Sequence, residues 1–251
     1  MNNSLSRLQG ATAVTTDGET GTVKDIYFDD ERWTVRYLVV KTGGWLSGRK
    51  VLVSPRAVTA IDWGERKLTL NLTHEQIRNS PEIDTDKPVS RQHESEFSAY
   101  YGYPYYWGGP LVWGYAAYPA VQPIPEPPRE AQAAAAGAAG ARREQGDPHL
   151  RSSNEVTGYE IRATDDSIGH VKDFLVDHRD WSIRLMVIDT GNWWPGKKVL
   201  IAPDRIDHVS WEERQLAVNI TRAQVEGSAE YDPAKAEQGG GLYRAGDKPF
   251  F

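Results

Sequence analysis

The alternation of hydrophobic and polar positions indicates short β-strands in the first part of the chain. Apolar residues recur at every second position in stretches separated by turn signals such as Asp17-Gly18 and Gly43-Gly44. The pattern predicts strands over Ala11–Thr15, Thr22–Phe28, Trp33–Lys41, Lys50–Ser54, Val58–Trp63 and Lys67–Leu72. Five or six short strands in under 80 residues are typical of a small closed or half-open barrel, because curling a sheet hides its edges.

A short helix is predicted directly after the last strand. The spacing Thr73-x-x-Gln76 fits a capping box, in which each of the two side chains bonds the backbone of the other residue. Asn79-Ser80-Pro81 should end the helix, because proline and the residue before it leave helical geometry. The same spacing returns as Thr221-x-x-Gln224.

The whole strand pattern returns 148 residues later. Gly21-Thr22-Val23-Lys24-Asp25 reappears as Gly169-His170-Val171-Lys172-Asp173, and the register then holds without a gap. From Gly21 to Asp84, 26 of 64 positions are identical. We therefore predict an all-β protein with two small barrels in tandem, over residues 1–84 and 153–234, each with a short C-terminal helix.

Two segments of different composition lie outside the repeats, one between them and one after the second. Residues 85–152 hold nine of the 15 prolines, with an aromatic first half and an Ala-rich stretch over 131–141. Because proline at this density blocks helices and sheet ladders, we expect an extended, largely disordered linker. Residues 235–251 include Gly239-Gly240-Gly241 and are expected to be a flexible tail. The charge-free run over 97–125 is interrupted by proline, so a membrane span is not expected, but docking on a membrane surface or a partner stays open.

Composition narrows the function classes. The chain has no cysteine, which excludes disulfides and thiolate metal sites, and its net charge of −6 argues against direct nucleic-acid binding. Met1–Gln9 lacks the apolar core of a secretory signal, so we expect a cytoplasmic protein. No histidine spacing fits a zinc site, and no nucleotide or nucleophile motif is present. We expect no enzyme, and no catalytic, cofactor or metal site.

The repeated polar residues are the candidate site residues. Asp25 and Asp29 recur as Asp173 and Asp177; they are interpreted as turn residues that accept backbone N–H groups, with acid–base or cation-binding roles as alternatives. Arg36 recurs as Arg184. A buried Arg–Asp pair that positions two strands is one interpretation of these arginines, and an anion site is the other.

Tryptophans mark a Gly-flanked turn in both repeats. Trp45 in the first repeat is matched by Trp193, which Trp194 follows. A tryptophan on such a loop either serves as a recognition residue or folds back to plug the barrel end.

These residues together carry a family resemblance. Gly21-x-Val23-x-Asp25 with Asp29, the strand 36–40, the turn Thr42-Gly43-Gly44-Trp45-x-x-Gly48 and Val51-x-Val53-x-Pro55 resemble the PRC-barrel family. That β-barrel domain is shared by the cytoplasmic part of the H subunit of the photosynthetic reaction centre and the ribosome maturation factor RimM. The second repeat carries the same set from Gly169 to Pro203. The resemblance implies two barrels with no common catalytic residue, in a family whose known members bind proteins or bear on an assembled complex.

The resulting hypothesis is a non-enzymatic interaction and assembly module with a protein partner of unknown identity. Two small barrels would gain stability by burying apolar surface against each other about a pseudo-two-fold axis, within one chain or in a homodimer. The alternatives are a membrane-peripheral accessory of electron transfer that resembles the reaction-centre barrel protein, a ribosome-associated maturation factor, and a ligand or ion sensor. The last would use the barrel mouth around Asp25 and Trp45.

Overall fold

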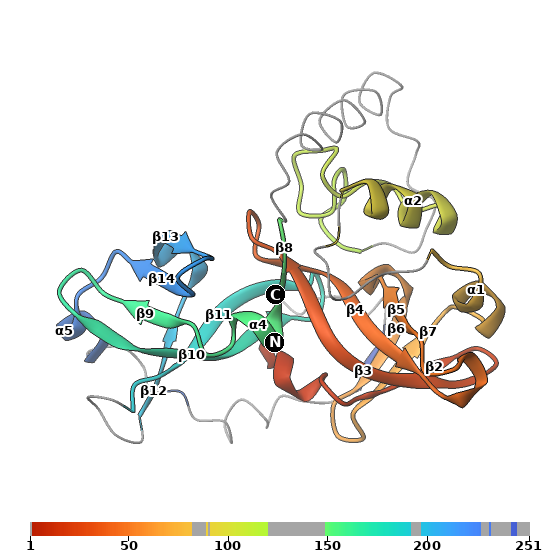
Figure 1. Ribbon diagram of the computed structural model, residues 1–251, viewed down its shortest axis with the longest axis horizontal. Helices are drawn as coiled ribbons and strands as arrows, with labels where there is room; N and C mark the ends of the chain where they lie inside the picture. The colour runs from red at the N-terminus through yellow and green to blue at the C-terminus, as the bar shows by residue number, and fades with distance from the viewer. Residues whose placement is uncertain are drawn as a thin grey trace.

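The computed structural model describes residues 2–81, 89, 91–119, 149–191, 197–226, 231 and 242–244. It is mostly β, with two strand-rich halves side by side and one longer helix above the first half (Figure 1). The elements of the first half are β1 (Asn2–Ser4), η1 (Leu5–Arg7), β2 (Thr12–Thr15), β3 (Gly18–Asp29), β4 (Thr34–Thr42), η2 (Gly44–Leu46), β5 (Lys50–Val53), η3 (Pro55–Ala57), β6 (Val58–Asp62), β7 (Lys67–Leu70) and α1 (His74–Arg78).

The second half repeats this order after the helix α2 (Arg91–Tyr101). Its elements are β8 (Leu150–Ser152), α4 (Ser153–Val156), β9 (Glu160–Arg162), β10 (Ser167–Asp177), β11 (Ser182–Asp189), β12 (Lys198–Ile201), η4 (Pro203–Arg205), β13 (Ile206–Ser210), β14 (Gln215–Val218), α5 (Arg222–Glu226) and, far along the chain, β15 (Leu242–Arg244). The predicted helix caps are present: Thr73 and Gln76 form the capping box of α1, and Thr221 and Gln224 exchange the equivalent bonds.

The strands of each half form an open, curved sheet and not a closed barrel. In the first half the order is β5-β4-β3-β2-β7-β6, and the second half has the equivalent order β12-β11-β10-β9-β14-β13. The end strands β5 and β6 do not pair with each other among the described residues. Of the closed and half-open barrels that the sequence allows, the closed one is therefore not found in the described part of the chain. The 3-10 turn η3, capped by the Ser54 hydroxyl and started by Pro55, directs the chain away from β5 before β6 begins.

The two halves are joined into one continuous sheet where β4 meets β11. The backbone N–H of Val35 donates to the Trp181 carbonyl at 2.9 Å, and the N–H of Ile183 donates to the Trp33 carbonyl at 2.7 Å. These two bonds are related by the 148-residue offset of the repeat, so the junction has local two-fold pseudo-symmetry.

Each half also lends a short segment to the other. We call residues 2–9 the first arm and residues 149–157 the second arm. The first arm carries β1, which pairs antiparallel with β10 of the second half. The second arm carries β8, which pairs antiparallel with β3 of the first half. The exchange is reciprocal, and neither sheet contains all of its strands without the other half.

A glycine fixes the close approach of the two longest strands in each repeat. A Cβ atom on Gly21 would lie 2.1 Å from the Lys41 carbonyl oxygen, and one on Gly169 would lie 2.0 Å from the Asp189 carbonyl oxygen. No side chain fits at that distance, which explains physically why the repeated motif begins with glycine.

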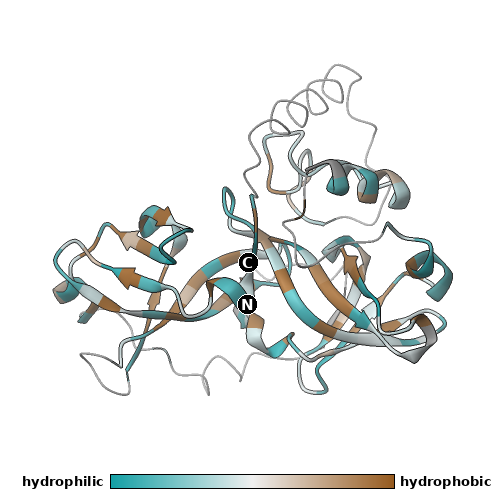
Figure 2. Ribbon diagram, in the orientation of Figure 1, coloured by the Kyte–Doolittle hydropathy of each residue, from teal (hydrophilic) through white to brown (hydrophobic). Residues whose placement is uncertain are grey.

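One hydrophobic core runs through both halves, and a second lies under α2. The first cluster contains residues of both repeats, among them Phe28, Val40, Ile161 and Met186. Figure 2 shows hydrophobic positions along the central strands of both halves. The second cluster lies on the opposite side of β3 and β4; its members are Tyr27, Tyr37, Val39, Leu52, Val89, Phe97 and Leu150. Strand β4 is consequently buried on both faces.

Parts of two segments that were expected to be disordered form secondary structure among the described residues. Residues 91–119, which we call the insert, belong to the segment 85–152 but form α2 and a packed loop whose Phe97 and Trp113 are fully buried. Leu242–Arg244 belong to the expected tail 235–251 but form β15, which pairs antiparallel with β6. The remainder of the tail, and the connection over 120–148, lie outside the described residues.

Candidate functional site

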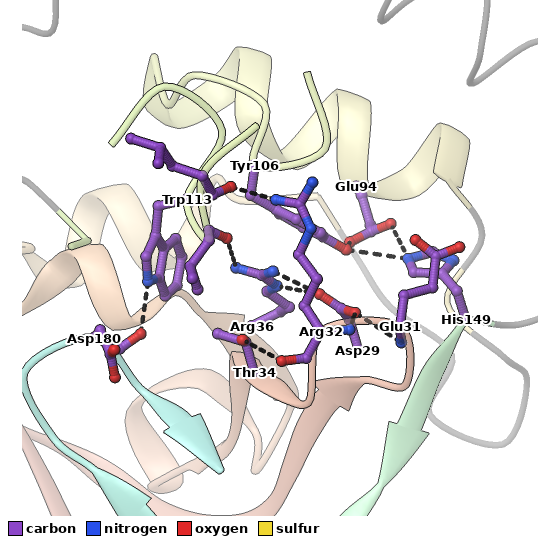
Figure 3. A network of polar contacts seen from close by, with 12 residues as sticks. Asp29, Glu31, Arg32, Thr34, Arg36, Glu94, Tyr106, Trp113, His149 and Asp180 are labelled. Carbon is purple, nitrogen blue, oxygen red and sulfur yellow. Dashed lines mark hydrogen bonds and ion pairs between the residues drawn. The ribbon is translucent and has the colours of Figure 1, made fainter. Parts of the chain in front are cut away.

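A buried ion pair lies at the end of β3 in the first repeat. The Arg36 side chain on β4 is fully buried, and its Nε and Nη2 donate to Asp29 Oδ2 at 2.8 and 2.5 Å (Figure 3). The other oxygen of Asp29 accepts the backbone N–H groups of Glu31 and Arg32 at 3.0 and 2.7 Å. Asp29 therefore closes the turn and neutralises Arg36 at once, and both interactions hold the two strands in register.

The insert supplies the remaining acceptors for the arginines beneath it. Arg36 Nη1 donates to the Val112 carbonyl at 2.7 Å, and Arg56 Nη2 donates to the Trp113 carbonyl at 3.3 Å. Arg32 donates to the carbonyls of Gly109, at 3.0 Å, and of Leu111. Because buried guanidinium groups need acceptors, these arginines bind and hold the backbone carbonyls of a loop that carries no charge of its own.

Aromatic rings of the insert cover the same arginines. The Arg36 guanidinium lies 4.0 Å from the centre of the Tyr106 ring and 4.9 Å from that of Trp113. Arg56 lies 5.2 Å from the Trp113 ring. Burial, with a contribution from the like charge of Arg36, lowers the pKa of Arg56 to about 10, and burial raises the pKa of Tyr103 to about 12. Cation–π contacts of this kind strengthen as water is excluded.

A buried trio ties the insert to the second arm. The Tyr106 hydroxyl donates to Glu94 Oε1 at 2.6 Å, and His149 Nε2 lies 2.8 Å from Glu94 Oε2. Tyr106 also lies 3.1 Å from His149 Nε2. Glu94 comes from α2, Tyr106 from the loop of the insert and His149 from the start of the second arm. One network therefore fixes the position of all three segments (Figure 3).

The insert exposes several large apolar side chains. The exposed large hydrophobic side chains of the described residues all belong to it: Tyr100, Leu111, Tyr115 and Tyr118. We call Leu111, Tyr115 and Tyr118 the aromatic face; they are 44, 45 and 51% exposed. Beside them, Trp113 Nε1 donates to the Asp180 carbonyl at 2.7 Å, which anchors this loop to the second half as well.

The equivalent residues of the second repeat are arranged differently. Arg184 is 49% exposed and pairs with Asp180 at 2.5 Å, away from Asp177. Asp177 instead binds Arg179. Burial alone would raise the pKa of Asp177, but hydrogen bonds from the Arg179 side chain and backbone lower it to about 2. The expected pair of the repeated arginine with the repeated aspartate thus forms in the first repeat and not in the second.

The carboxylates of Asp25 and Asp173 hold the exchanged arms. Asp25 accepts from the Ser152 hydroxyl at 2.6 Å, and burial raises its pKa while these hydrogen bonds partly oppose the rise. Asp173 accepts from the hydroxyls of Ser4 and Ser6, the latter at 2.8 Å. Each of the two repeated aspartates therefore bonds the arm of the other half.

The tryptophan predictions remain open. Trp45 lies in η2, but its side chain is outside the described part of the structure, as are Trp193 and Trp194 entirely. Within the described residues, no group of three or more His, Asp or Glu side chains could hold a metal ion. No helix among those residues is long and apolar enough to cross a membrane.

The family of the chain follows from its two halves. A family model of the PRC-barrel domain matches residues 2–77 and again residues 148–225, together more than half of the chain. The chain belongs to the PRC-barrel domain family. Both matches begin at an arm, so each PRC-barrel domain comprises its own arm and strands, and the arms are exchanged between domains. No curated protein matches this chain.

Sequence reasoning missed the residues that the insert and the second arm bring to the site. Glu94, Tyr106, Trp113 and His149 lie in the segment expected to be disordered, and none of them was singled out. The available signal was on β4, where Tyr37 and Val39 alternate with Leu38 and Val40 so that both faces are apolar. A strand that is apolar on both faces requires a cover on each.

Proposed function

We propose that this PRC-barrel protein is a non-enzymatic interaction and assembly module in the cytoplasm that binds a protein partner through its aromatic face. One observation carries the proposal. The insert places Leu111, Tyr115 and Tyr118 in solvent on a loop whose backbone is held by Arg32, Arg36 and the indole of Trp113.

The energetics of recognition favour such a surface. Exposed tyrosines contribute large contact area with few rotatable bonds, so little conformational entropy is lost when they are covered. A loop held in place before binding loses still less. Hot spots of interfaces are typically aromatic residues on a preorganised support, and the anchoring bonds of the aromatic face supply that support.

The polar side chains whose chemistry could serve catalysis make structural contacts instead. Arg36 and Asp29 neutralise each other, and Glu94, Tyr106 and His149 bond one another while joining the insert to the second arm. These uses support a binding role in preference to catalysis.

The test is capture of partners from the native host with a tagged protein and three matched baits. The baits are the unaltered chain, the double variant Tyr115→Ala/Tyr118→Ala and the control Tyr100→Ala, which removes an exposed tyrosine of α2. We expect one complex to be recovered with the unaltered chain and the control and lost with the double variant. Recovery of the same proteins with all three baits, with their folded state confirmed by thermal denaturation, would refute the role of the aromatic face.

A lipid surface is the second candidate partner, because exposed tyrosines are also the side chains that settle at membrane interfaces. Sedimentation with zwitterionic vesicles of phosphatidylcholine distinguishes the two. A lipid role predicts that the unaltered chain sediments with the vesicles and that the double variant does not. A protein partner predicts that neither does.

A further inference from the structure

The two exchanged arms make equivalent contacts. The Ser152 hydroxyl of the second arm bonds Asp25 at 2.6 Å, and the Ser4 hydroxyl of the first arm bonds Asp173. Each pair of contact residues is related to the other by the repeat offset of 148 positions. In both cases three residues of the arm pair with the end of the long strand in the other half.

Each arm is followed directly by a glycine with left-handed backbone. Gly10 has φ of 78° and Gly158 has φ of 95°. Their N–H groups donate to the carbonyls of Val23 at 2.7 Å and Val171 at 2.8 Å, which returns the chain to its own repeat. An L-residue rarely adopts this conformation, so these positions are built as turning points between an arm and its domain.

The arms also bury apolar side chains. Leu5 and Leu8 of the first arm, and Val156 of the second, are fully buried in the core that runs through both halves. An arm that leaves its site therefore exposes both its own leucines or valine and the surface that received them. Because exposure of this apolar surface is unfavourable, each receiving site should hold an arm at equilibrium. The arm can come from the same chain or from a second copy.

The contacts do not depend on the covalent path between arm and receiving strand. Ser4 and Asp173 are 169 residues apart in sequence. An arm of a second molecule would therefore find the same strand, the same carboxylate and the same apolar site. Exchange of identical elements between copies costs little for this reason. The connection between the halves raises the local concentration of the arm of the same chain, so the balance depends on protein concentration.

We propose that two copies of this chain associate by exchanging halves. The first arm of each copy docks on β10 of the other, and the second arm of each docks on β3 of the other. The partner that fits these two sites is a second copy of this chain. This self-association uses none of the residues of the aromatic face and is independent of the proposed function.

The absence of cysteine from the chain allows a direct test. Asn3 and Val176 are Cα partners in the ladder between β1 and β10, and facing residues of antiparallel strands lie within the distance that a disulfide spans. The single variants Asn3→Cys and Val176→Cys are purified separately, mixed, unfolded and refolded together in urea, and oxidised with oxidised glutathione. A disulfide between two chains forms only when the arm of one chain lies on the other.

The control pair is Asn3→Cys with Glu213→Cys, since Glu213 is exposed and lies on the turn before β14. We expect a disulfide-linked dimer from Asn3→Cys and Val176→Cys in excess of the control pair. Its amount should rise about fourfold when the concentrations of both chains are doubled, until the sites fill. Inter-chain product no greater than in the control, at every concentration, would overturn the proposal.

The double variant Asn3→Cys/Val176→Cys in one chain checks the docked arm itself. Dilute protein should close an intramolecular disulfide, visible as faster migration without reductant and confirmed by peptide mass spectrometry. If this bond does not form in a folded protein, the arm does not occupy the site on β10, and the proposal fails at its first step.

Discussion

Replacing Arg36 by leucine tests whether the buried ion pair holds the insert in place. The side chain is fully buried, bonds Asp29 twice, bonds the Val112 carbonyl and lies against the Tyr106 ring. Leucine leaves the Asp29 carboxylate buried without its cation, and breaking one side of a buried pair costs about 3–5 kcal/mol. The equivalent change Arg184→Leu removes a half-exposed pair with Asp180, which contributes about 0–1 kcal/mol.

The two variants are compared by thermal denaturation followed by circular dichroism. For a chain of this size, 1 kcal/mol shifts Tm by about 2–4 °C. Arg36→Leu should therefore lower Tm by about 6–20 °C, and Arg184→Leu by less than about 4 °C. Limited proteolysis should also cut the insert sooner in Arg36→Leu than in Arg184→Leu. Equal shifts of Tm for the two variants, or an insert equally resistant in both, would refute the reasoning.

Three further changes test separate features. Gly21→Ala should lower the free energy of unfolding by about 1–3 kcal/mol, because its Cβ meets the Lys41 carbonyl. Gly44→Ala has open space around the new Cβ and should lower it by under about 0.5 kcal/mol. Urea denaturation measures both variants, and similar midpoints would contradict the strand contact. Asp177→Asn should make the free energy of unfolding fall less steeply as the pH is lowered. The folded carboxyl has a pKa of about 2 against 3.8 unperturbed, so its contribution is present above pH 3.8 and lost as the pH falls toward 2; a urea series from pH 2 to 5 that is unchanged by the substitution would count against this. Trp113→Phe loses the bond from its indole to a carbonyl of the second half and should lower stability by about 1 kcal/mol, which an unchanged Tm would disprove.

The repeat, most strands and both helix caps could be predicted because their signals are local. Alternation of side chains identifies a strand from its own residues, and Thr73 with Gln76 specifies a capping box within one helical turn. The close packing at Gly21 left a visible trace too, since the same glycine returns in the second repeat. The sequence also predicted five or six strands per repeat but did not decide between a closed and a half-open barrel, because closure depends on the path of the chain through η3.

The insert could not be predicted because its order comes from residues outside it. The proline and glycine content was interpreted as a sign of disorder. That interpretation is valid for a segment whose backbone groups find no hydrogen-bond partners elsewhere in the protein. Here Arg32, Arg36 and Arg56 approach from the first repeat and provide donors for the carbonyls of the loop. No periodicity within the insert reports those donors, and only the apolar outer face of β4 indicated that a cover was needed.

The arms escaped prediction for a related reason. Strands of three residues such as Asn2–Ser4 and Leu150–Ser152 are too short to show alternation. The aspartates that hold them, Asp25 and Asp173, were correctly singled out as repeated, but a repeated carboxylate does not say which segment it bonds. Each aspartate could bond the arm of its own repeat or the arm of the other repeat. Which of the two it bonds is decided only when the two halves pack together.

The exchange of arms has a consequence for the protein as it leaves the ribosome. The first domain has all its own strands once residue 81 has emerged, but two strands that extend its sheet come later, at Leu150–Ser152 and at Leu242–Arg244. At typical rates of synthesis the second arm, which ends at residue 157, follows about 4–15 s later. During that interval the end of β3 lacks its partner strand and the apolar site of the second arm is unfilled. The exchange between copies proposed above predicts that a neighbouring nascent chain on the same messenger can supply the missing arm. The order of synthesis, and not the final stability alone, then sets how many chains complete themselves and how many complete each other.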